Sequence, residues 1–218
     1  MTNFRNSNLA QAWLVLLLAT VFGTALASIQ IKLNPVIEAN KIRETMEKIP
    51  NLILDPSQAT DIGTEDLVIQ SRVIEVDKNG ISKFYPIYDV HLKNGSLAGH
   101  VAKATGQGYA DKIELLLGLD AGGNAITGLF ILGQKETPGL GNRIVEKPWR
   151  DQFVNKSSDI TLVVVKSKSG QDNEIDGISG ATISSRSVTN IVNTTVADIK
   201  PQLIPLTKKE KDTKEENK

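Results

Sequence analysis

A long apolar stretch opens the chain. No charged residue occurs from Asn6 to Ile31, and a helix needs about 20 residues to cross the hydrocarbon core of a bilayer. The pattern predicts a transmembrane anchor over residues 9–31, preceded by a short N-terminus, residues 1–8. The anchor carries no acidic residue, so we do not expect it to hold a transported ion itself.

The charges beside this stretch predict its orientation. Arg5 and the free amine lie in a very short tail, so the positive-inside rule keeps that tail in the cytoplasm and places the chain from Lys32 onward outside. A second interpretation is a cleaved signal peptide, because Ala25-Leu26-Ala27 resembles a processing site. The apolar run is longer than the roughly 7–15 residues of a signal core, which favours an uncleaved anchor. Both interpretations place the folded part outside the cytoplasm.

Residues 32–66 are expected to connect the anchor to a folded domain. Apolar residues at helical spacing after Pro35 predict a stalk helix from Val36 to Ile49. The stretch that follows, Asn51–Glu65, is rich in Asp, Pro, Ser and Gly and predicts a linker.

The folded part begins with strand-like runs separated by turns. The expected strands are Leu67–Val76, Ile81–Val90, Lys112–Leu119, Ala125–Leu132 and Ile160–Lys166. Pro86 favours an edge position for the second strand, since proline lacks the N–H of a ladder hydrogen bond. The last run is almost entirely Ile, Leu and Val and predicts a buried strand.

Two helices are expected in addition to these strands. Pro148–Val154 predicts a short helix with proline in its first turn. A longer helix is predicted over Ile183–Ile199, with one face formed by Ile183, Val188, Ile191, Val192, Thr195 and Ile199. Pro201 should end this helix, and the charged tail, residues 201–218, should be disordered. The fold class is therefore α+β: one domain over residues 67–200, with an antiparallel sheet and a long C-terminal helix.

Composition excludes several classes of function. Lys and Arg number 25, as do Asp and Glu, so no basic surface for nucleic acid is expected. The absence of cysteine rules out disulfides, thiolate nucleophiles and iron–sulfur clusters held by thiolates. His91 and His100 are too few for a histidine metal cage, and we expect them to be ordinary polar residues near a turn. No histidine paired with a carboxylate is recognisable, so no catalytic acid–base group is predicted.

Small and hydroxyl residues open the last predicted helix, over Asp176–Ser185. Free N–H groups and the positive end of the helix dipole suit a phosphate at such a place, and Gly180 permits close approach of the backbone. The alternative is that Ser179 or Thr182 only caps the helix. Taken alone, this segment favours the cap.

A second segment, Glu136-Thr137-Pro138-Gly139-Leu140-Gly141, follows a predicted strand. Proline and two glycines predict a shaped loop whose backbone amides can face a ligand. An ordinary turn is the alternative.

Together the two segments resemble the FMN-binding domain of the G subunit of the Rnf electron-transport complex. The chain is also similar to the C subunit of the sodium-translocating NADH:quinone reductase. The resemblance covers roughly residues 95–200 and rests on Ser179-Gly180-Ala181-Thr182, on Asp176 three positions before it, and on Glu136–Gly141. Gly108-Tyr109 is a weaker match, and Gln134 stands where Rnf members often have histidine.

The resemblance implies a cofactor and the residues that hold it. Thr182 would carry FMN through a phosphoester, attached by a separate flavin transferase that uses FAD. The transferase recognition site and the phosphate surroundings would comprise Asp176, Ser179, Gly180 and Ala181. The flavin would lie along Glu136, Thr137, Leu140 and Gly141. No catalytic residue and no metal site is implied.

The function implied by the resemblance is that of an electron-carrying subunit of an ion-translocating oxidoreductase in the cell inner membrane. Its partners would be other membrane subunits, the flavin transferase and lipid, with no nucleic acid. The compact length favours the Rnf complex over the quinone reductase. Two other functions remain open: a small flavin reductase that acts alone, and a membrane-tethered binding or assembly domain without enzymatic activity.

Overall fold

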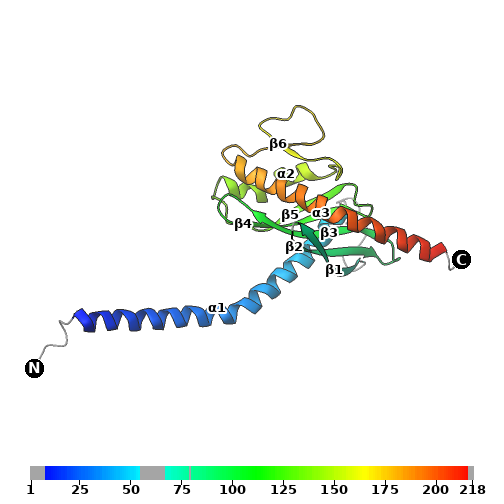
Figure 1. The fold of residues 1–218 in the computed structure, drawn as a ribbon. Coiled ribbons are helices and arrows are strands. Elements are labelled where there is room, and N and C mark those ends of the chain that lie inside the picture. Colours follow the sequence, from blue (N-terminus) through cyan, green and yellow to red (C-terminus); the bar gives the residue numbers. More distant parts are fainter. Residues whose placement is uncertain (1–7, 55–66, 79, 216–218) are drawn as a thin grey trace, which may run out of the picture. The chain divides into compact units, whose positions relative to one another are not determined.

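A computed structural model describes residues 8–54, 67–78 and 80–215 of the chain (Figure 1). It contains two compact units, residues 1–44 and 45–218, which are described separately. The predicted N-terminus up to residue 7, the linker from residue 55 onward and the end of the tail, residues 216–218, lie outside the described residues.

Helix α1 (Asn8–Ile53) forms the described part of the first unit and enters the second. It is one helix where the sequence predicted an anchor and a separate stalk, because Pro35 removes a single N–H without ending it. Within the described residues, it is the helix that is long and apolar enough to cross a membrane. The Thr20 and Ser28 hydroxyls donate to carbonyl oxygens four residues earlier, at 2.8 and 2.7 Å, so these polar groups are satisfied within the helix, as a hydrocarbon environment requires.

An antiparallel sheet forms the centre of the second unit (Figure 1). Its strands lie in chain order: β1 (Leu67–Lys78), β2 (Ile81–Leu92), β3 (Leu97–Gln107), β4 (Lys112–Asp120) and β5 (Ile126–Gly133). The antiparallel α+β fold predicted from the sequence is confirmed. Strand β3 was not predicted.

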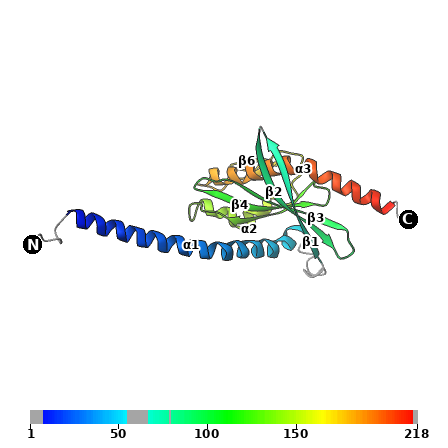
Figure 2. The ribbon, with the colours of Figure 1, turned by 60° about the horizontal axis from the view of Figure 1, so that its bottom comes forward.

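The edge position predicted for the strand with Pro86 is wrong for the strand as a whole. β2 lies between β1 and β3, but its pairing with β3 begins only at Ile87, opposite Ala102. Pro86 pairs with Val73 of β1, in the part of the β1–β2 hairpin that extends past β3 (Figure 2). Its missing N–H is tolerated because this part of β2 is locally an edge.

The chain after β5 forms short elements. They are η3 (Gly141–Val145), α2 (Lys147–Arg150), η4 (Asp151–Phe153) and the parallel pair β6 (Val163–Val165) and β7 (Glu174–Asp176). The short helix that begins near Pro148 is confirmed. The buried strand Ile160–Lys166 is wrong: only 163–165 are extended in a sheet, and Ile160 and Val163 are 37% and 42% exposed. Leu162, at 3% exposed, is the residue of this run that enters the core.

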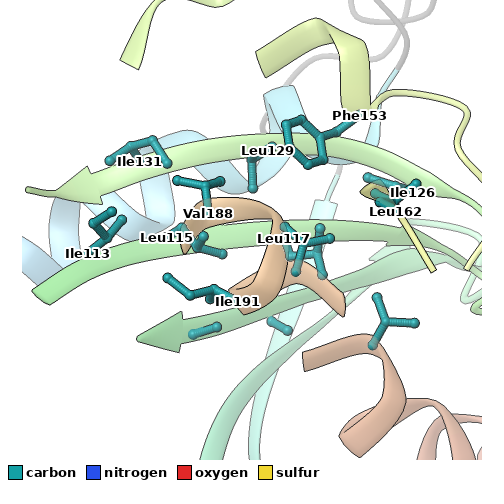
Figure 3. Close-up of a cluster of buried hydrophobic side chains, with 14 of the residues drawn as sticks. Ile113, Leu115, Leu117, Ile126, Leu129, Ile131, Phe153, Leu162, Val188 and Ile191 are labelled. Atoms are coloured by element: carbon teal, nitrogen blue, oxygen red, sulfur yellow. The ribbon is translucent and has the colours of Figure 1, made fainter. Parts of the chain in front are cut away.

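Helix α3 (Thr182–Glu215) covers one face of the sheet. Figure 3 shows Val188 and Ile191 of α3 among apolar side chains of β4 and β5. Five of the six predicted core residues on this helix are buried, whereas Ile183 is 54% exposed. The predicted end at Pro201 is wrong, since α3 continues to Glu215.

The last turns of α1 belong to the second unit and pack with a separate apolar cluster. Ile49 and Leu52 join Val90, Val101 and Leu116 in it. Leu116 alternates with Leu115 and Leu117 of the α3 cluster along β4, so the two clusters occupy opposite faces of the sheet.

Candidate functional site

The first turn of α3 leaves backbone N–H groups unpaired. Its first helical hydrogen bond runs from Ser185 N to Ala181 O, at 3.1 Å. In the part of the chain that the structure describes, the N–H groups of Thr182, Ile183 and Ser184 have no acceptor, as is general for the start of a helix. These groups and the helix dipole favour an anion at this end.

The segment before Thr182 is held by Ser185. Ile178 N donates to Ser185 Oγ at 3.0 Å, and the same hydroxyl donates to Ala181 O at 3.0 Å. Gly180 has φ +78°, a conformation that favours glycine. Neither Ser179 nor Thr182 makes a side-chain hydrogen bond to another described residue. The helix-cap interpretation of these two residues therefore lacks the hydrogen bond that it requires.

The second predicted segment is a tight turn beside this one. Leu140 N donates to Thr137 O at 3.2 Å across Pro138 and Gly139, and Gly139 has φ +75°, which is the pattern of a type II turn. Leu140 is 44% exposed. A Cβ on Gly180 would lie 3.0 Å from Leu140 Cδ2, so the turn directly contacts the segment before α3.

Glu136 connects the two segments and was expected to lie along a flavin. It is 4% exposed. Its Oε1 accepts from the backbone N–H groups of Tyr109 and Ala110, at 2.9 and 3.1 Å, and its Oε2 accepts from the Ser184 hydroxyl, at 2.5 Å. Glu136 thus joins the β3–β4 turn, the 136–141 loop and the first turn of α3. Ser184, which sequence analysis missed, is a buried hydroxyl on the polar run that opens this helix.

Asp176 is held mainly through its backbone. Its N–H donates to Gln152 Oε1 at 2.9 Å, and its carbonyl accepts from Trp149 Nε1 at 2.9 Å. Its carboxylate is 46% exposed and lies 4.0 Å from Lys168 Nζ. These contacts attach the segment before α3 to α2 and η4.

The predicted residues lie together, but they are not equally accessible. Ser179, Gly180, Thr137 and Leu140 are exposed, Thr182 is half-buried, and Ala181, Gly141 and Glu136 are buried. Two further exposed apolar residues were not named as site residues: Tyr109, at 62%, which was only a weaker match of the resemblance, and Ile183, at 54%.

This arrangement fits FMN. Three unpaired N–H groups at a helix start suit its phosphate, and exposed Tyr109, Leu140 and Ile183 offer apolar surface to a planar ring. A cavity of about 380 Å³ between β2 and β3 is not lined by the predicted residues.

A buried charged group lies apart from this site. His100 Nδ1 contacts Asp89 Oδ1 at 2.5 Å, and Arg72 Nε donates to Asp89 Oδ2 at 2.6 Å. The expectation of no histidine–carboxylate pair, and of ordinary polar histidines, is wrong for His100, which is 1% exposed. Burial acts to raise the pKa of Asp89, but hydrogen bonds from His100 and Arg72 outweigh it and leave the pKa below its ordinary value. Across the described residues, no group of three or more His, Asp or Glu could hold a metal ion.

Comparison with known proteins bears on the same segments. Residues 108–197 match a family described as the FMN-binding domain. Solved structures of similar fold include the C subunit of a Na(+)-translocating NADH-quinone reductase from Parabacteroides distasonis, with a TM-score of 0.55 and 22% identity, covering 77% of this chain and 92% of that one.

Curated relatives carry the family assignment. The G subunit of the Na(+)-translocating ferredoxin:NAD(+) oxidoreductase complex of Acetobacterium woodii is 40% identical over 54% of this chain and 58% of its own length. The G subunit of the proton-translocating complex of Clostridium ljungdahlii is 35% identical over 60% of this chain and 72% of its own. The G subunit of an ion-translocating oxidoreductase complex of Haemophilus influenzae is 31% identical over 81% of each. This chain, whose residues 108–197 match the FMN-binding domain, therefore belongs to the family of the G subunits of ion-translocating oxidoreductase complexes.

Proposed function

We propose that this chain is the electron-carrying subunit of a membrane-bound, ion-translocating oxidoreductase, and that FMN is attached to Thr182 through a phosphoester. The observation that carries the proposal is the position of Thr182. Its hydroxyl makes no hydrogen bond to the described residues, and it begins a helix with three unpaired N–H groups. The relatives of this chain are subunits of ion-translocating complexes, which supports the proposal that this chain is also part of such a complex.

The proposed linkage suits this helix end. A flavin transferase that uses FAD would form the bond between Thr182 Oγ1 and phosphorus while a P–O bond of the FAD pyrophosphate breaks; AMP leaves and the hydroxyl proton is released. The resulting phosphodiester keeps one negative charge, which the N–H groups and the dipole of α3 stabilise. Covalent attachment also retains the cofactor in a compartment outside the cytoplasm.

FMN supplies the redox chemistry, because it accepts one or two electrons. The chain's own residues have three tasks. The first turn of α3 would hold the phosphate, Leu140 and the exposed apolar residues beside it would limit the orientation of the ring, and buried Glu136 holds the surrounding segments in place. No residue of the chain is assigned a catalytic proton transfer.

The test is covalent flavin on the full chain. The protein is expressed with a flavin transferase, denatured and separated by electrophoresis, and flavin fluorescence is measured on the band. We expect fluorescence for the wild type and for the control Thr194→Val, a β-branched replacement further along α3, and none for Thr182→Val. Fluorescence that persists in Thr182→Val would overturn the attachment site, and its absence from the wild type would overturn the flavin proposal.

Membership in a larger complex needs its own test. Under mild detergent, we expect the holoprotein to purify with other integral membrane subunits and to show no steady turnover of soluble acceptors alone. Steady turnover by the isolated protein would favour a reductase that acts alone. The C subunit of the quinone reductase from Vibrio vulnificus is 32% identical over 44% of this chain and 41% of its own length, so a quinone reductase component is the second candidate. Co-purification with quinone reductase subunits would select it.

The charges at the N-terminus support one orientation of the chain relative to the membrane. We propose that the N-terminus lies in the cytoplasm and that the FMN-binding domain lies outside. The chain has no cysteine, so a single introduced cysteine is the one thiol of the chain that a maleimide can label. In intact cells, we expect an impermeant maleimide to label Asp172→Cys, in an exposed loop of the domain, and not Ser7→Cys. The reverse pattern would overturn this orientation, and loss of the Ser7→Cys tail from the mature protein would indicate cleavage.

A further inference from the structure

Glu136 is a buried carboxylate with hydrogen-bond donors on both oxygens. Two backbone N–H groups donate to Oε1 and the Ser184 hydroxyl donates to Oε2. An ionised carboxylate only accepts, so these donors satisfy its charged form. Among the residues that the structure describes, no Lys, Arg or His forms an ion pair with Glu136. Within this part of the chain, its negative charge is therefore not neutralised by a direct ion pair.

The chain leaves space for this carboxylate on two sides. A Cβ on Gly108 would lie 2.3 Å from Glu136 Oε1, and a Cβ on Gly141 would lie 3.0 Å from Oε2 and 2.6 Å from Ser184 Oγ. Side chains at either glycine would displace the carboxylate from its donors. The glycines, the donors and the carboxylate thus form one arrangement around the first turn of α3.

Ser184 brings the charge close to the attachment turn. It lies two residues after Thr182 in the same helical turn, and its hydroxyl contacts Glu136 directly. A charge in a buried, weakly polarisable environment acts on its surroundings more strongly than a charge exposed to water and salt. The field of Glu136 is therefore felt at the turn on which we place FMN.

We propose that Glu136 is a positioning residue for the turn that carries FMN and that its buried charge lowers the midpoint potential of this FMN. The proposal rests on the function proposed above. Electrons that arrive without a matching number of protons add negative charge to the cofactor, and a fixed negative charge nearby opposes their arrival. Glu136 acts through Ser184 and the field, and no contact with the cofactor is required.

The main test is a redox titration of the full-length holoprotein carrying Glu136→Gln. The glutamine oxygen can accept from Tyr109 N and Ala110 N, and its amide can donate to Ser184 Oγ, so the variant removes the charge while keeping the hydrogen-bonding capacity. We expect a more positive midpoint potential that persists at high salt. The control is Glu146→Gln, which removes the same charge from an exposed side chain paired with Arg143; its potential should stay near that of the wild type. Equal potentials in the two variants would overturn the proposal.

A second variant separates charge from packing. Ser184→Ala removes a donor from Glu136 and keeps the charge, which is then less compensated by hydrogen bonds, so its potential should be lower than that of the wild type. A rise in both Glu136→Gln and Ser184→Ala would indicate a packing effect and overturn the proposal. If Glu136→Gln did not fold, the direction of the shift in Ser184→Ala would decide alone.

These outcomes are distinguishable from failure of the proposed function. A wild type without covalent FMN would overturn both. A wild type that carries FMN, together with a Glu136→Gln variant of unchanged potential, would overturn only the role of Glu136.

Discussion

The Tyr85 hydroxyl donates a 2.7 Å hydrogen bond to Asp198 Oδ2 and so joins β2 to α3 across 113 positions of sequence. Both residues are buried, and Lys78 Nζ contacts the other carboxylate oxygen. Burial, together with the hydrogen bond and the charge of Asp198, raises the pKa of Tyr85 above its ordinary value. The neutral hydroxyl is therefore a permanent donor that attaches the β1–β2 hairpin to the helix.

Loss of this donor should destabilise the domain. Tyr85→Phe leaves Asp198 buried with one partner fewer, and we expect the free energy of unfolding to fall by about 1–3 kcal/mol. The control is Tyr88→Phe on the same strand, whose hydroxyl bonds to no described residue; we expect it to change stability by no more than about 0.5 kcal/mol. Denaturant unfolding of the full chain in detergent measures both. Equal effects would show that the Tyr85–Asp198 bond contributes nothing specific.

The Asp89 group predicts how stability depends on pH. Its pKa is lowered in the folded state by hydrogen bonds from His100 and Arg72, which outweigh burial. A carboxylate with a lowered folded pKa contributes stability that is present above the unfolded value, about 3.9, and is lost as pH falls through the folded pKa. The free energy of unfolding should therefore decline below about pH 4.

Asp89→Asn tests this assignment. It should be less stable than the wild type at pH 7, and the difference should shrink as pH falls below about 4. Asp172→Asn, in an exposed loop, is the control and should follow the wild-type curve. An Asp89→Asn curve that stays parallel to the wild type through this range would contradict the linkage.

Two glycines on β5 differ in how much space surrounds them, so their replacement by alanine separates the effect of close packing on stability from the effect of backbone conformation. A Cβ on Gly128 would lie 2.8 Å from Leu52 Cδ2 and 3.2 Å from Leu52 Cα, whereas a Cβ on Gly133 would meet its nearest atom, Glu114 Cβ, at 3.9 Å. We expect Gly128→Ala to destabilise the domain by about 1–3 kcal/mol, because the last turn of α1 must move. Gly133→Ala should be neutral or slightly stabilising. Thermal unfolding of both variants makes the comparison, and a neutral Gly128→Ala would mean that Leu52 does not pack there.

Four of the five predicted strands are present as expected, but β3 was missed for a physical reason. It carries Ala102, Ala104 and Gly106 on the face toward α3, and a Cβ on Gly106 would lie 2.4 Å from Ile191. The helix requires small residues there, so the strand lacks the apolar alternation that local sequence analysis detects. Its existence depends on a contact about 85 positions away in the chain, which no local pattern contains.

The sequence motifs pointed to the segments of the candidate site, but they did not predict the contacts between these segments. The sequence placed Glu136 along the ligand, whereas the structure buries it against Ser184, 48 positions away. Ile183 fits the apolar face of its helix by spacing, but it lies in the first turn of α3 and is exposed. Pro35 and Pro201 were taken as breaks because local rules treat proline so, yet α1 and α3 continue through them.

The last prediction distinguishes a ligand-bearing hydroxyl from a capping one at the start of α3. Ser185 Oγ accepts from Ile178 N and donates to Ala181 O, so Ser185→Ala leaves a buried N–H unpaired and should cost about 1–3 kcal/mol. Thr182→Val removes a hydroxyl without a hydrogen bond to the described residues and should change stability by no more than about 0.5 kcal/mol. Both are measured by denaturant unfolding of protein made without the flavin transferase, so that no cofactor contributes. A helix cap at Thr182 would instead cost about 1 kcal/mol on replacement. A loss of that size in Thr182→Val, without any flavin present, would therefore assign the hydroxyl to the helix and remove the main structural support for its role as an attachment point.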